Sequence, residues 1–160
     1  MNKNDFVSKI KEVPFAQQIV YNKLQNLNNL EKVRNRLKEP AAMEKLKSQI
    51  DESKAEQLKN KLENIHLTSD SLSIESSMGT LSLEIVEREE YKCIKFEGKG
   101  APVGLLMWIQ IIPAGEQNCQ LRVTLRADLN MFIRKMVEKK LTEGVEQLAE
   151  MLAHLPYDAE

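Results

Sequence analysis

A long stretch near the C-terminus repeats its apolar residues at steps of three and four. Between Asp128 and Leu155 these positions are Leu129, Ile133, Met136, Val137, Leu141, Val145, Leu148, Leu152 and Leu155. Eight charged residues stand between them, so the stretch has one apolar face and one charged face. The pattern predicts one long helix that must bury its apolar face against another element.

Between residues 72 and 127 the apolar residues instead alternate with polar ones, which is the pattern of half-buried strands. The last strand places four apolar residues on one side: Leu121, Val123, Leu125 and Ala127. Turn signals at Met78-Gly79 and at residues 113–116 separate the strands. One buried face and one wet face indicate an antiparallel sheet, on which the long helix can lie.

The first 64 residues predict one strand, over residues 6–13, followed by helices. Pro14 suits the first turn of one helix, and a second helix starts near Asn28 and ends before Pro40. Residues 41–64 are rich in Lys, Glu and Gln, and their sparse apolar stripe skips a turn, so the segment is either two short helices or one longer helix. Such a segment is usually a solvated helical face, and the alternative is a lid over a pocket mouth.

The composition is that of an ordinary globular domain of 160 residues, with 42% hydrophobic and 29% charged residues. The net charge of −1 gives no electrostatic reason to expect nucleic acid or an anionic membrane as a partner. We expect no membrane span, because the longest apolar run, Val103 to Ile112, contains Gln110. The N-terminus lacks the apolar core of a signal peptide, which predicts a cytoplasmic protein with Cys93 and Cys119 as free thiols.

The sequence contains no recognisable catalytic, metal-binding or cofactor-binding arrangement. His66 and His154 are far apart, and neither cysteine has a neighbouring base. There is no GxGxxG and no P-loop spacing. The inward row of the last predicted strand carries no acid or base, and the only phenols well inside the chain are Tyr21 and Tyr91. We therefore expect no catalytic residue, no metal and no cofactor.

The order of strand, two helices, antiparallel strands and one long helix resembles the START-like, or SRPBCC, superfamily. Polyketide cyclases, START lipid-transfer domains and relatives of the birch-pollen allergen share this helix-grip fold. Several phrases carry the resemblance: Asn28-Asn-Leu-Glu31, Met78-Gly-Thr-Leu81, Leu106-Met-Trp-Ile-Gln110, Arg126-Ala-Asp-Leu-Asn130 and Met131-Phe-Ile-Arg134. They are similar to the second helix, a strand start, the last two strands and the grip helix of uncharacterised bacterial members.

The resemblance covers essentially the whole chain, so it implies one START-like domain over residues 1–160. The implied fold class is α+β, with a curved antiparallel sheet wrapped around the C-terminal helix and short helices after the first strand. Residues 41–64 depart from the resemblance, because a shorter connection is expected there. They are therefore interpreted as a charged helical insertion.

In that superfamily the sheet and the long helix enclose an apolar cavity. Carried onto this sequence, the resemblance implies a lining of sheet and helix residues: Leu83, Ile85, Ile94, Phe96, Met107, Ile109, Leu121, Val123, Leu125, Met136, Val137 and Leu141. The implied function is non-catalytic binding, or transport, of a small hydrophobic or lipid-like molecule. A set this apolar fits a filled core equally well, because ligand pockets usually hold a few polar groups. A cyclase- or hydratase-type enzyme and a protein-interaction module are the alternatives.

Trp108 lies in a row that the alternation turns outward. If positions 107, 109 and 111 face inward, then Leu106, Trp108 and Ile112 form an exposed apolar row. Such a row predicts a homodimer formed through the outer face of the sheet. Two alternatives remain open: the strand register is shifted by one residue, or residues 41–64 cover the row.

Overall fold

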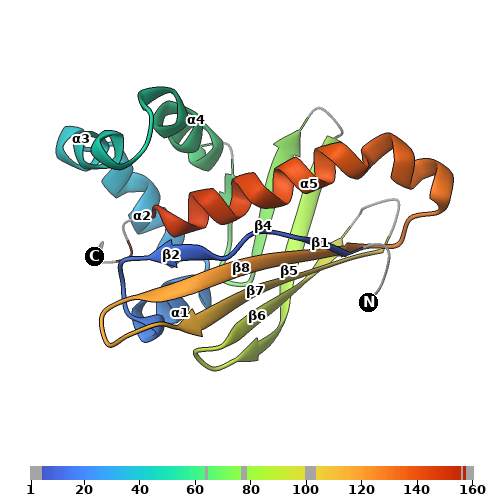
Figure 1. Ribbon diagram of the computed structural model, residues 1–160, viewed down its shortest axis with the longest axis horizontal. Helices are drawn as coiled ribbons and strands as arrows, with labels where there is room; N and C mark the ends of the chain where they lie inside the picture. Colours follow the sequence, from blue (N-terminus) through green and yellow to red (C-terminus); the bar gives the residue numbers. More distant parts are fainter. Residues whose placement is uncertain (1–4, 64, 77–78, 100–103, 156, 158–160) are drawn as a thin grey trace.

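The computed structural model describes residues 5–63, 65–76, 79–99, 104–155 and 157. An antiparallel sheet, four short helices and one long C-terminal helix, α5, make up the fold (Figure 1). The elements are β1 (Asp5–Val7), β2 (Lys11–Val13), α1 (Gln17–Leu24), α2 (Asn29–Leu37), α3 (Pro40–Gln49), α4 (Glu52–Glu63), β3 (Ile65–Leu67), β4 (Ser71–Ser76), β5 (Gly79–Glu89), β6 (Cys93–Lys99), β7 (Leu105–Pro113), β8 (Cys119–Ala127) and α5 (Met131–Ala153). The predicted α+β class is confirmed.

The eight strands form one sheet in the order β1-β8-β7-β6-β5-β4-β3, and β2 also pairs with β8. Residues 6–13 are two short strands rather than the one expected. The break falls at buried Ser8, whose backbone N–H donates to the Val123 carbonyl at 2.9 Å and whose Oγ accepts from the Val123 N–H at 3.0 Å. These two hydrogen bonds let the chain bend while both halves stay on β8.

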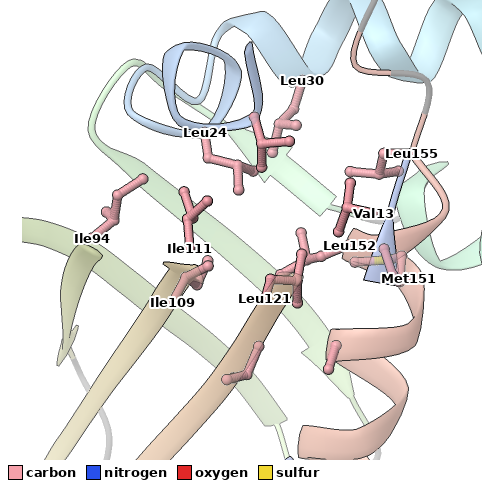
Figure 2. Close-up of a cluster of buried hydrophobic side chains, with 14 of the residues drawn as sticks. Val13, Leu24, Leu30, Ile94, Ile109, Ile111, Leu121, Met151, Leu152 and Leu155 are labelled. Atoms are coloured by element: carbon pink, nitrogen blue, oxygen red, sulfur yellow. The ribbon is translucent and has the colours of Figure 1, made fainter. Parts of the chain in front are cut away.

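The inner face of the sheet has the register that the alternation predicts. Met107, Ile109 and Ile111 are buried on β7, and Ile109 lies opposite buried Val123 of β8. Figure 2 shows strand residues such as Ile109 directed toward Leu24 of α1 and the end of α5. A bulge between Ile85 and Glu87 interrupts the β5–β6 pairing. Bulges of this kind bend a sheet and increase its twist.

The fully buried residues of helix α5 lie in its second half. It begins three residues later than expected, at Met131, because the Asn130 side chain caps it by accepting from the Ile133 N–H at 2.9 Å. Val145, Ala149 and Leu152 are buried. By contrast, the first half exposes large apolar side chains, so the continuous buried stripe that the sequence pattern suggests is not observed.

The N-terminal helices close one end of the grip. Leu24, Leu27 and Val33 of the α1–α2 region are buried, and α1 is fixed to β7 by a 3.1 Å hydrogen bond from Gln17 Nε2 to the Ile111 carbonyl. Residues 41–64 contain two short helices rather than one longer helix. They lie beside the C-terminal half of α5 (Figure 1), on the α5 side of the sheet, so they do not cover the outer row around Trp108.

The predicted turn at Met78-Gly79 lies partly outside the described residues, because Met78 is not among them. The predicted hairpin turn between β7 and β8 is present at residues 114–118.

Candidate functional site

A small apolar cavity lies between the sheet, the α1–α2 region and the second half of α5. Its volume is about 40 Å³. Every described side chain that lines it is apolar: Leu24, Leu27, Leu30, Ile65, Leu67, Leu72, Leu83, Phe96, Met107, Ile109, Leu148, Met151, Leu152 and Leu155. Several of these, from three parts of the chain, appear together in Figure 2. A wall of this kind can hold an apolar molecule, but it offers no polar group to orient one.

The sheet residues expected at the cavity all reach the inner side of the sheet, but only some of them form its wall. Four do so: Leu83, Phe96, Met107 and Ile109. Four others are buried in the surrounding core: Ile85, Ile94, Leu121 and Val123. Leu125 is half-buried and packs against that core. Their part in ligand binding stays a prediction.

The helix contributes a different part of its length from the part expected. Met136 is 68% exposed, and Val137 and Leu141 are half-buried, so none of them lies at the cavity wall. Instead, the wall is formed by residues at least two turns later: Leu148, Met151 and Leu152. Helix periodicity identifies which face is apolar, but it does not fix where along its length the helix crosses the cavity.

Six wall residues were not predicted to line the cavity, although the sequence pattern placed them in helices or strands. They are Leu24, Leu27, Leu30, Ile65, Leu67 and Leu72. The spacing of three between the first three leucines was the available signal, since it continues from α1 through the connection to α2. A run of apolar residues through a turn indicates that the turn itself is packed against something.

A polar groove of about 270 Å³ runs beside the cavity, between β2, the α3–α4 segment and α5. Lys11 Nζ lies 3.1 Å from Glu146 Oε2 and 3.1 Å from Glu150 Oε2. Burial opposes the charge on Lys11, but the two carboxylates outweigh it and raise the lysine pKa. Burial likewise opposes the charge on both glutamates, yet hydrogen bonds that include Lys11 lower the pKa of each. This ion cluster joins β2 to α5.

Met151 lines both the polar groove and the apolar cavity. Its side chain is 7% exposed, and half-buried Ile50 lies on the groove side. The thioether chain of methionine has three rotatable bonds and repacks readily. One flexible side chain therefore forms part of the boundary between the groove and the cavity.

The two thiols are poor nucleophiles in this fold. Burial, with a smaller contribution from Glu12, raises the pKa of Cys119 to about 11. Burial and the charges of Glu89 and Glu87 also raise the pKa of Cys93. Both cysteines are free. Over the described part of the chain, no group of three or more His, Cys, Asp or Glu side chains is arranged to hold a metal ion.

The outer row of β7 is half-buried rather than fully exposed. Leu106, Trp108 and Ile112 share this intermediate burial. The Trp108 ring has Lys95 Nζ at 5.6 Å and the Arg126 guanidinium at 5.1 Å from its centroid. These cation–π contacts cover part of the ring. The register is not inverted, and a homodimer through this face stays a prediction.

The architecture and the cavity together define the class of the protein. An antiparallel sheet curved around a long C-terminal helix, with short helices after the first strands and an apolar cavity inside, is the helix-grip arrangement (Figure 1). The chain therefore has the START-like, or SRPBCC, fold that the sequence resemblance implied.

Solved structures with this fold superpose on nearly the whole chain. A START superfamily protein from Mycobacterium smegmatis is 14% identical, with a TM-score of 0.57 over 93% of this chain and 94% of that one. Norcoclaurine synthase from Thalictrum flavum, in complex with dopamine and hydroxybenzaldehyde, is 12% identical, with a TM-score of 0.61 over 93% and 84%. An uncharacterised protein from Bacillus thuringiensis is 11% identical, with a TM-score of 0.53 over 94% and 96%. At these identities the likeness concerns the fold alone.

No family model matches the sequence, and no curated protein matches it. Within the described ranges, no helix combines the length and the apolar character needed to cross a bilayer. A function for this protein must therefore rest on the fold and on the cavity.

Proposed function

We propose that this protein binds a small hydrophobic molecule between the inner face of its sheet and the second half of α5, without catalysing a reaction. The observation that supports the proposal is the cavity wall, in which all fourteen described side chains are apolar. Transfer of apolar surface from water into such a wall is favourable by about 25 cal/mol per Å². A lipid-like chain suits the same lining, so transport of such a molecule is a natural extension.

The size of the cavity determines how a ligand would enter. A volume of about 40 Å³ is far below the roughly 300–1,000 Å³ of ordinary ligand pockets, so the wall must open. The strands are joined to one another by backbone ladders, whereas α5 and the α1–α2 region meet the sheet mainly through side chains. We therefore expect that moving the helices away from the sheet requires less free energy than separating the strands.

Catalysis is the less favoured alternative. Norcoclaurine synthase is an enzyme with the same fold. Acid–base chemistry needs a titratable side chain directed into the site, and among the described residues none lines the cavity. A wall without such groups favours binding over catalysis.

The proposal includes the organisation of the chain and its location. Residues 1–160 would form one domain, with residues 41–64 as an insertion beside the groove. A cytoplasmic location is consistent with two free thiols, because disulfides are rare in a reducing compartment.

Two leucines of α5 provide a matched test. Leu148 lines the cavity and Leu141 does not, although both are half-buried on the same helix. A larger side chain at position 148 occupies the space that a ligand needs. Leu148→Trp should therefore weaken binding of a neutral naphthylamine fluorophore by about tenfold or more, and Leu141→Trp should change it little. Probe fluorescence, excited outside the tryptophan band, measures both affinities.

The melting temperature of each variant must show that the fold survives. Native mass spectrometry of the unmodified protein adds an independent test, since a retained small molecule would reveal the ligand class. Failure of the wild-type protein to bind any apolar probe, or equal losses in the two variants, would contradict the proposal.

A further inference from the structure

The first half of α5 presents large apolar side chains to solvent. Met131 is 76% exposed, Phe132 75% and Met136 68%. These are the three most exposed among the large hydrophobic residues whose exposure the structure gives. Burying side chains of this size removes substantial apolar surface from water, so an exposed group of them often marks an interaction surface.

The exposed apolar residues share one side of the helix with lysines. Phe132 and Met136 are four residues apart and so lie one turn above each other, as do Lys135 and Lys139 on the neighbouring row. Met131 and Lys140 flank these rows. We call this solvent-facing set the docking face: Met131, Phe132, Lys135, Met136, Lys139 and Lys140.

The lysines of the docking face are not used elsewhere in the fold. Lys135, Lys139 and Lys140 are exposed and take part in none of the ion pairs found among the described residues. Arg134 differs from them, because its guanidinium lies 5.1 Å from the Phe6 ring and its Nη2 lies 3.3 Å from Glu138 Oε1.

Stability of the helix does not account for this placement of positive charge. Acidic residues favour the N-terminal end of a helix and basic residues the C-terminal end. Helix α5 has no acidic residue in its first turn and has basic residues soon after it. This dipole effect falls off within the first turn, and Lys135, Lys139 and Lys140 lie beyond it, so the helix dipole does not explain these lysines.

We propose that the docking face binds the surface of an anionic phospholipid membrane. Phe132 and Met136 would enter the boundary between headgroups and acyl chains, and the lysines would contact lipid phosphates. The net charge of −1 gave no reason to expect such a partner, but that total conceals the three lysines of this face, which outnumber Glu143, the exposed acidic residue one turn beyond Lys139. The inference uses a surface away from the cavity and does not depend on the proposed ligand.

A second copy of the chain fits this face poorly. In a symmetric dimer the same patch meets itself, so the lysines of one copy would approach those of the other. Like charges brought together in this way disfavour association. An anionic bilayer supplies both the apolar layer and the opposite charge that the docking face lacks.

Cosedimentation with lipid vesicles tests the proposal on the full chain. The protein should bind vesicles that mix phosphatidylglycerol with phosphatidylcholine about tenfold more tightly than pure phosphatidylcholine, and high salt should weaken that binding. Lys135→Glu combined with Lys139→Glu should reduce binding to the mixed vesicles by about tenfold or more. Phe132→Ser combined with Met136→Ser should also reduce it by about tenfold.

Matched controls place the same changes elsewhere on the surface. Lys32→Glu with Lys45→Glu alters the net charge equally on α2 and α3, and Ile19→Ser with Val86→Ser removes exposed apolar side chains from α1 and β5. Both control variants should bind nearly as well as the wild-type protein. In a Phe132→Trp variant, brominated lipids should quench the added fluorescence, which reports insertion at that position.

Several outcomes would overturn the proposal. They are no binding to the mixed vesicles, equal binding to neutral and anionic vesicles, and equal losses in the docking-face and control variants. If light scattering shows that the wild-type protein is a dimer and that the Phe132→Ser, Met136→Ser double variant is a monomer, the face would belong to a dimer interface. Binding to an acidic protein in place of lipid would overturn it as well.

Discussion

At the scale of single residues, two glycines show opposite local constraints. A Cβ added to Gly98 would lie 2.7 Å from the Leu105 Cβ on the neighbouring strand, closer than non-bonded carbon atoms normally approach. A Cβ added to Gly144, on α5, would meet nothing within 4 Å. The first glycine is required by the close approach of two strands, whereas the second only adds backbone freedom to a helix.

Alanine at each position should therefore have effects of opposite sign. Gly98→Ala should lower the free energy of unfolding by about 1–3 kcal/mol, because Leu105 or the strand must move. Gly144→Ala should raise it by about 0.5–1 kcal/mol through better helix propensity. Urea denaturation measures both, and each variant serves as the other's control. Destabilisation by Gly144→Ala would contradict this account.

At the scale of elements, the ion cluster of Lys11, Glu146 and Glu150 couples β2 to α5. The pKa of each glutamate is lowered in the folded state, below the usual 4.5. Their contribution to stability is therefore present above pH 4.5 and is lost as the pH falls through the lowered values. The raised pKa of Lys11, above 10.5, gives a contribution that is present below that pH and is lost as the pH rises further.

Replacing the lysine should weaken this link and change the acid response. Lys11→Met should cost about 1 kcal/mol at neutral pH, because the two glutamates remain partly exposed and screened. It should also reduce the loss of stability between neutral pH and pH values below 4.5. Urea denaturation at both pH values tests this. Lys54→Met is the control, since Lys54 lines the same groove and makes none of the described ion pairs.

At the scale of the whole molecule, the reactivity of the Cys119 thiol measures how often the fold opens enough to expose its core to solvent. Its side chain is fully buried in the core, whereas Cys93 is half-buried on β6. A thiol with a pKa of about 11 has only about one thiolate per thousand molecules at pH 8. Both its burial and its protonation therefore protect Cys119 from reaction.

An aromatic disulfide reagent should distinguish the two thiols. Cys93 should react first in the native protein, and Cys119 should react only as fast as the molecule unfolds. Adding urea should raise the Cys119 rate in parallel with the unfolded fraction. The single variants Cys93→Ser and Cys119→Ser assign each phase. Equal native rates for the two cysteines would contradict the buried position of Cys119.

Sequence reasoning recovered the parts of this fold that repeat. The alternation in β7 and β8 gave the correct inner face, because a slip of one residue would expose Ile109 and Val123 together. The helical repeat of apolar residues predicted the bounds of α5 to within a few residues at each end. Both signals are local, and both reflect burial on one face only.

The remaining features depend on contacts between distant residues. The break at Ser8 exists because Val123 exchanges hydrogen bonds with it, and no pattern near Ser8 indicates that partner. Met136 continues the apolar period of α5, yet it lies in the half of the helix that leaves the core. The cavity wall likewise depends on where α1 and α5 cross the sheet, which only the assembled structure fixes.

The short strands at both margins of the sheet have a consequence for self-association. One margin consists of β1 and β2 and the other of β3, each three residues long. Unpaired backbone groups on a long, flat outer strand serve as a template for further strands, and so for aggregation. Margins this short offer few such groups, so the molecule is protected against fibril-like growth by strand addition.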